Sequence, residues 1–62
     1  MGTKLIYQNW NREDGLMAEI FSSDGVFTLF CKDTDAGETF ASFRSTDPAI
    51  LLEKAKYFLQ YF

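Results

Sequence analysis

The sequence predicts an α+β fold: a small antiparallel β-meander of three or four strands, with one C-terminal helix packed on one face. Three observations predict it. Short runs rich in β-branched and aromatic residues alternate with turn formers over residues 4–45. An Asp-Gly pair, Asp24-Gly25, separates two of these runs. Asp47-Pro48 then opens a stretch in which apolar residues recur at helical spacing, and we expect residues 1–62 to form a single domain.

The first strand is predicted over residues 4–8 (KLIYQ), because this run is β-branched and aromatic. Residues 9–15 (NWNREDG) are dense in turn formers and predict a loop. Trp10 falls inside this loop. We expect its ring to fold back and cap an open end of the core.

A β-hairpin is predicted from residues 16–22 and 26–33, joined at Asp24-Gly25. Both central residues of a type I′ turn need positive φ, which Asp-Gly tolerates. Ser23 then faces Val26, and counting outward gives the register. The pairs predicted on the face toward the helix are Ile20 with Leu29, Ala18 with Cys31 and Ser22 with Phe27. Those predicted on the other face are Phe21 with Thr28, Glu19 with Phe30 and Met17 with Lys32.

Residues 34–37 (TDAG) predict a second turn, and residues 38–45 (ETFASFRS) a further strand. The register of this strand stays open, because loops of different length change which of Phe40 and Phe43 points inward.

The C-terminal helix begins at a strong start signal. Asp47 can accept hydrogen bonds from free backbone amides, and Pro48 suits the first helical position. Helical periodicity predicts a broad core-facing stripe and a narrower second apolar stripe. The core-facing residues are Leu51, Leu52, Ala55, Phe58, Leu59 and Phe62; the second stripe is Ile50, Tyr57 and Tyr61.

The small size of the chain favours self-association. A single core in a chain of 62 residues seldom supplies more than ~3–5 kcal/mol. With one cysteine and no histidine, neither an internal disulfide nor a typical zinc site can make up the shortfall. We therefore expect a homodimer with two-fold symmetry, the commonest arrangement.

Charge and hydropathy exclude several classes of function. The net charge is −3, and the six basic residues are dispersed, so no basic stripe for nucleic acid is present. No apolar run is long enough to span a bilayer, and residues 1–10 do not resemble a signal peptide. We expect a soluble, cytoplasmic protein without a cofactor and without membrane association.

Candidate chemical sites have simpler explanations. The run Asp33–Glu38 resembles a calcium loop, but its glycine comes one place early and Arg44 stands where a carboxylate is needed. Cys31 has no neighbouring base and is expected to be a buried core thiol. The carboxylate pairs Glu13-Asp14 and Asp35-Glu38 fall in exposed turns. We expect neither an enzyme nor a metal site.

The remaining signal is a surplus of apolar side chains, which favours a non-enzymatic protein-binding module. The predicted partner-binding residues are Trp10, Met17, Phe21, Phe30, Ile50, Tyr57 and Tyr61, with an acidic loop of Asp33, Asp35 and Glu38. In general character the chain resembles the small accessory proteins of bacteriophages and mobile elements. That resemblance implies stoichiometric inhibition of a host or defence protein.

Two alternatives stay open. In the first, the protein binds single-stranded nucleic acid, with bases stacked on Phe21 and Phe30 beside Lys32. The acidic charge argues against this alternative. In the second, the protein is a structural subunit of a larger assembly.

Overall fold

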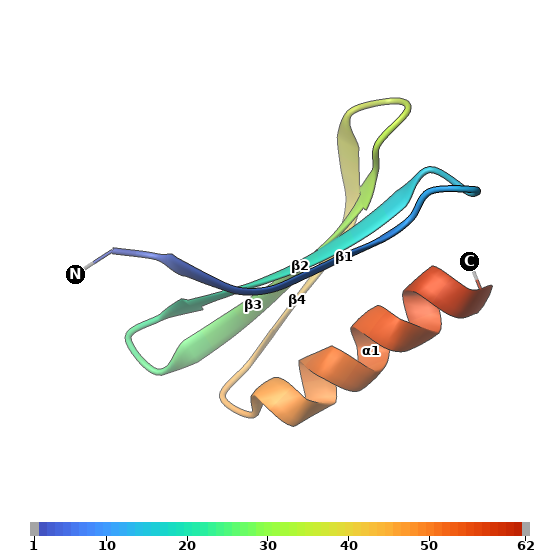
Figure 1. The fold of residues 1–62 in the computed structure, drawn as a ribbon. Helices are drawn as coiled ribbons and strands as arrows, with labels where there is room; N and C mark the ends of the chain where they lie inside the picture. The colour runs from blue at the N-terminus through green and yellow to red at the C-terminus, as the bar shows by residue number, and fades with distance from the viewer. Residues whose placement is uncertain (1, 62) are drawn as a thin grey trace.

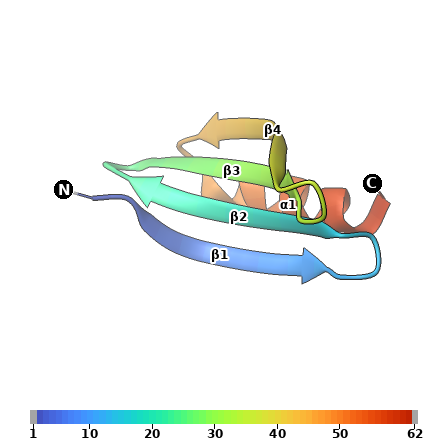
Figure 2. The same cartoon turned by 90° about the horizontal axis from the view of Figure 1, so that it is seen from above.

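The computed structural model describes residues 2–61, except for the side chain of Phe40. Its elements are β1 (Lys4–Asn11), β2 (Leu16–Ser23), β3 (Val26–Asp33), β4 (Glu38–Ser45) and α1 (Pro48–Tyr61). The strands form one antiparallel sheet in the order β1-β2-β3-β4. Figure 1 shows α1 lying along one face of this meander, and Figure 2 shows the four strands side by side in front of the helix. The predicted α+β fold is confirmed.

The central hairpin has the predicted register. Ser23 pairs with Val26, and every cross-strand pair counted outward from the turn is present. Asp24 and Gly25 have φ values of 52° and 80°, as a type I′ turn requires. The Asp-Gly signal was therefore sufficient to fix which side chains of β2 and β3 share a face.

The first strand is longer than predicted, and the prediction for Trp10 is wrong. β1 extends through Asn11, and Trp10 pairs with Met17 instead of lying in a loop. Its side chain does not cap the core, because the residue is 44% exposed. Pairing with β2 overrides the turn preference of the two asparagines. Asn9 accommodates the strand by accepting a hydrogen bond from the backbone amide of Trp10 (2.9 Å).

Asn11 also joins the end of β1 to the end of the helix. Its Nδ2 donates to the carbonyl of Leu59 (2.7 Å) and to the carboxylate of Asp14 (2.9 Å). The Leu59 carbonyl lies in the last turn of α1, where carbonyls have no partner within the helix. This contact between residues 48 positions apart stabilises the C-terminal end of α1 on the sheet.

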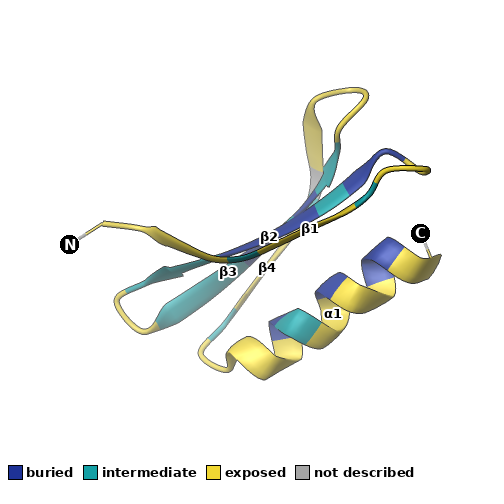
Figure 3. Ribbon diagram, in the orientation of Figure 1, coloured by how far each residue is buried: buried dark blue, intermediate teal, exposed yellow. Residues whose placement is uncertain are grey.

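The core lies between α1 and the helix-facing side of β2 and β3, coloured dark blue in Figure 3. Its most buried large side chains are Ile20, Leu29 and Leu51. The predicted helix stripe is largely confirmed: Leu51, Ala55, Phe58 and Leu59 are buried and Leu52 is partly buried, whereas Phe62 lies outside the described residues. The Oδ1 atom of Asp47 accepts a hydrogen bond from the amide of Ala49 (3.0 Å), so the predicted N-cap is present.

The structure settles the register of β4. Phe43 pairs with Leu29 and therefore faces the helix side. The pairing shifts between Cys31 and Lys32, which face Ala41 and Thr39, so Phe40 is the extra residue of a β-bulge. The side chain of Phe40 lies outside the described part of the chain.

The turn between β3 and β4 is stabilised by the side chain of Asp33. The Oδ1 atom of Asp33 accepts hydrogen bonds from the amides of Asp35 (2.9 Å) and Ala36 (3.2 Å). The amide of Thr34 donates to the carbonyl of Gly15 (2.8 Å), which joins this turn to the one between β1 and β2. Figure 1 shows the β3–β4 turn rising on the side of the sheet opposite α1.

Candidate partner-binding surface

The face of the sheet that α1 does not cover, here called the open face, carries four of the predicted partner-binding residues. Met17 and Phe21 alternate along β2 with the buried Leu16, Ala18 and Ile20. Trp10 on β1 stands opposite Met17. Phe30, on β3, contacts Phe21. The structure thus brings Trp10, Met17, Phe21 and Phe30 onto one face, although the sequence placed Trp10 in a loop.

The aromatic pair of the open face is ordered by its own packing. The rings of Phe21 and Phe30 meet edge to face, with centroids 5.7 Å apart and planes at 69°. Both residues are half-buried, because each covers part of the other. Leu5 pairs with Phe21 and is 42% exposed, which extends the apolar surface to the edge strand. Sequence reasoning missed Leu5, because the β1–β2 register could not be read from the chain.

An ion pair crosses the middle of the open face. The Nζ atom of Lys32 lies 2.5 Å from Oε1 of Glu19. The side-chain amide of Gln8 donates to Oε2 (2.8 Å). The Lys32 contact, opposed by burial and assisted by Gln8, holds the pKa of Glu19 below its ordinary value. Neighbouring side chains cover this carboxylate, whereas the Lys32 side chain is 34% exposed.

We expect Glu19→Gln to weaken the pH dependence of stability. A folded-state pKa below the unfolded value means that the ionised form stabilises the fold above the unfolded pKa, near 4.5, and that this contribution is lost as pH falls through the folded pKa. Near neutral pH the substitution should cost about 1–2 kcal/mol, at the low end because water screens Lys32.

Urea unfolding of the two proteins at neutral and acidic pH checks this prediction. The difference in unfolding free energy between wild type and variant should shrink on acidification. A difference that stays constant across the acid range would show that the ion pair does not contribute in the expected way.

Two of the three residues of the acidic loop make contacts within the protein. Asp33 uses Oδ1 to hold the turn amides, and the carboxylate of Asp35 lies against Gly15. Glu38 is exposed at the start of β4. Across residues 2–61 no group of three or more acidic or cysteine side chains is arranged to hold a metal ion. Asp35 and Glu38 are both exposed, so these two residues of the acidic loop are accessible to a partner.

The other three predicted residues lie on α1, on the opposite side of the sheet from the open face. Ile50 is 48% exposed, and Tyr57 and Tyr61 are each 65% exposed. Phe43 of β4 joins them, since it faces the helix side yet remains 40% exposed. We call Phe43, Ile50, Tyr57 and Tyr61 the helix–edge surface. The sequence left open which way Phe43 points, and the structure places it on the helix side.

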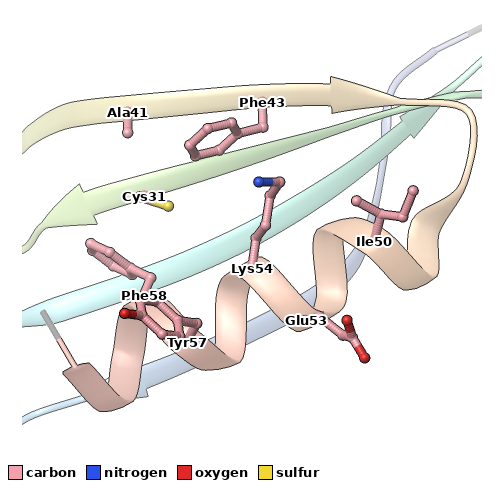
Figure 4. Close-up of a pocket in the computed structure, with 8 residues that line it drawn as sticks. All are labelled: Cys31, Ala41, Phe43, Ile50, Glu53, Lys54, Tyr57 and Phe58. Atoms are coloured by element: carbon pink, nitrogen blue, oxygen red, sulfur yellow. The ribbon is translucent and has the colours of Figure 1, made fainter.

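A groove of about 540 Å³ runs between β4 and α1 within the helix–edge surface. Figure 4 shows Ala41 and Phe43 on the strand side, with Ile50, Lys54 and Tyr57 along the helix. The Lys54 ammonium lies 4.9 Å from the centre of the Phe43 ring, a cation–π contact across the groove. The rings of Tyr57 and Tyr61 pack against each other, with centroids 4.7 Å apart.

Cys31 lies at the base of this groove and is 2% exposed. Burial raises the pKa of its thiol, so the reactive thiolate is disfavoured. The prediction that Cys31 is a buried core thiol is confirmed.

Comparison with protein-family models, with curated proteins and with solved structures finds no match. No helix among residues 2–61 is long and apolar enough to cross a membrane. The two apolar surfaces and their charges are the features of the protein that indicate a function.

Proposed function

We propose that the protein is a non-enzymatic protein-binding module that covers part of a larger protein with its open face. One observation carries this proposal: Trp10, Met17, Phe21 and Phe30 gather on the one sheet face that no helix covers. Trp, Phe and Met are the residue types that concentrate at the centres of protein interfaces. Stoichiometric masking of the partner is the mode of action that such a surface supports.

The open face is suited to binding because little has to be ordered or neutralised first. The edge-to-face packing of Phe21 and Phe30 reduces the entropy that these side chains lose on binding. Glu19 and Lys32 neutralise each other, so neither charge needs a counterion from the partner. The face presents apolar surface beside the Glu19–Lys32 ion pair, with the Arg12 guanidinium 5.4 Å from the centre of the Trp10 ring.

The rim of the open face indicates the charge of the partner. Asp35 and Glu38 lie in and beside a turn that rises on the open-face side, and the whole chain has a net charge of −3. Complementary potentials favour encounter and orientation. The partner is thus an apolar protein patch with basic residues at its edge. A nucleic-acid partner would need Lys32 to contact its phosphates, but Lys32 is paired with Glu19. This pairing favours a protein partner.

The test is the substitution Trp10→Ala, with Tyr57→Ala as its matched control. Both residues are exposed, so both variants should fold, and circular dichroism checks this. Partners captured from the source cell are identified by cross-linking and mass spectrometry, and their affinity for each purified variant is then measured. We expect Trp10→Ala to weaken binding at least tenfold, more than ~1.4 kcal/mol, and Tyr57→Ala to leave it unchanged. A partner that binds the Trp10 variant as tightly as wild type contradicts the proposal.

A further inference from the structure

The free edge of the sheet at β4 lies beside the groove of the helix–edge surface. β4 is the last strand in the sheet order, so the backbone groups on its outer side have no strand partner within residues 2–61. Beyond its bulge, β4 pairs regularly with β3 from Ala41 to Ser45. A strand added here would extend the sheet and cover the groove at the same time.

The opposite edge offers no such combination. Both edge strands carry a bulge, and β1 pairs regularly with β2 from Tyr7 to Asn11, so what distinguishes the edges is the surface beside them. The hollow between the end of β1 and α1 is lined mainly by polar and charged residues, among them Asn9, Arg12, Glu13 and Lys56. The groove beside β4 is therefore lined mainly by apolar residues and the hollow beside β1 mainly by polar ones, although β1 itself exposes Leu5, Ile6 and Trp10.

We propose that β4 pairs with β4 of a second copy of this chain, so that two sheets join into one antiparallel sheet of eight strands around a two-fold axis. This symmetry places both helices on the same side of the joined sheet, with their groove flanks facing each other. Phe43, Ile50 and Tyr57 of each copy then meet the same residues of the other. The pairing covers Ile50 and Tyr57, which are 48% and 65% exposed, and leaves the open face free.

The charges of the groove fit a second copy. Glu53 and Lys54 are neighbours on α1, and both line the groove. A surface that carries both signs side by side is complementary to itself under a two-fold rotation, where Glu53 of one copy faces Lys54 of the other. A strongly acidic or basic partner would gain from only one of these charges.

The size of the surface is also adequate. A standard interface buries about 800 Å² on each partner. This is about a fifth of the 4307 Å² that one chain exposes. The interface draws on a strand of 8 residues and the flank of a helix of 14 residues.

The solution mass tests the pairing first. Sedimentation equilibrium from low-micromolar to millimolar concentration should show the mass rising from one chain of 7.1 kDa towards two. Phe43→Glu and Tyr57→Glu should each weaken dimerisation at least tenfold, because they place like charges opposite each other at the two-fold axis. Tyr57 is 65% exposed, so its variant should fold even if the Phe43 variant does not. Trp10→Glu, on the open face, should leave the dimer intact.

Spin labels identify which edge is paired. In a Cys31→Ala background, one label is attached at Ser42→Cys on β4 and, in a second protein, at Lys4→Cys on β1. Strands in a sheet are ~4.8 Å apart, so the two β4 strands are adjacent while the two β1 strands are seven spacings apart, at least about 34 Å. Dipolar spectroscopy should therefore give a short distance for the Ser42 label and a long one for the Lys4 label.

A chain that remains at 7.1 kDa at millimolar concentration overturns the inference, as does a dimer with the two distances reversed. These outcomes are separate from those of the proposed function, because that proposal rests on Trp10 and the open face. A monomer that still binds its partner through Trp10 would leave the proposed function standing. A dimer that binds its partner equally well with Trp10→Ala would support the pairing of β4 and contradict the proposed function.

Discussion

Replacing Leu29 by alanine is expected to leave much of the protein unfolded at room temperature. Leu29 is fully buried at the centre of the sheet, under α1. Truncating a buried leucine to alanine costs about 2–5 kcal/mol of stability, partly because a cavity remains. A core in a domain of this size supplies only ~3–5 kcal/mol in total. Urea unfolding followed by far-ultraviolet circular dichroism measures the loss.

Leu5→Ala is the matched control for Leu29→Ala, because it removes the same atoms from another strand of the sheet. Leu5 is 42% exposed on the edge strand β1. Its truncation should cost less than about 1 kcal/mol. Equal losses for the two leucines would mean that the core does not lie between β3 and α1 as described.

The second large effect is expected at Gly15, in the turn between β1 and β2. Gly15 has a φ of +66°, in the left-handed region that costs other residues about 1–2 kcal/mol. An added Cβ would also lie 2.5 Å from Oδ2 of Asp35, so this carboxylate must move. Gly15→Ala should therefore lower the free energy of unfolding by about 2 kcal/mol.

Gly25 and Asp35 separate the two causes of this effect. Gly25 has a φ of +80° and open space where a Cβ would stand, so Gly25→Ala reports the backbone cost alone. Gly15→Ala should cost about 1 kcal/mol more than Gly25→Ala, at the low end for overpacking because Asp35 is exposed and can turn aside. Asp35→Ala in the Gly15→Ala background should remove the excess. An excess that persists would place its cause outside the contact with Asp35.

Local signals predicted the central hairpin and the helix. Asp24-Gly25 determined a turn of known geometry, and the register of β2 and β3 followed by counting. Asp47-Pro48 located the helix start, and apolar spacing identified which side chains of α1 are buried. These features depend on residues close together in the chain, so a single sequence contains the information.

The parts that could not be predicted depend on contacts between distant residues. Asn9 and Asn11 resemble turn formers, but β2 holds them in a strand and Asn11 bonds to Leu59 at the far end of the chain. The bulge at Phe40 decides that Phe43 faces the helix side, and no local signal marks it.

The sequence indicated most of the candidate residues but not how the structure arranges them. Met17, Phe21 and Phe30 were assigned to one sheet face by the hairpin register, and the structure brings Trp10 to the same face. The helix stripe of Ile50, Tyr57 and Tyr61 followed from periodicity, and these residues are exposed as predicted. Phe43 and the groove depend on how far α1 extends across β4, which is a property of tertiary packing alone.

Fluorescence quenching of Trp10 tests most directly whether the open face is uncovered. Trp10 is the one tryptophan of the chain, so its emission reports this face without substitution. Because Trp10 is 44% exposed, we predict that acrylamide quenches it in the purified protein with about half the efficiency seen in the urea-unfolded chain, equally below and above dimer formation, and that the bound partner protects it. Strong protection of Trp10 in the protein on its own would contradict the account.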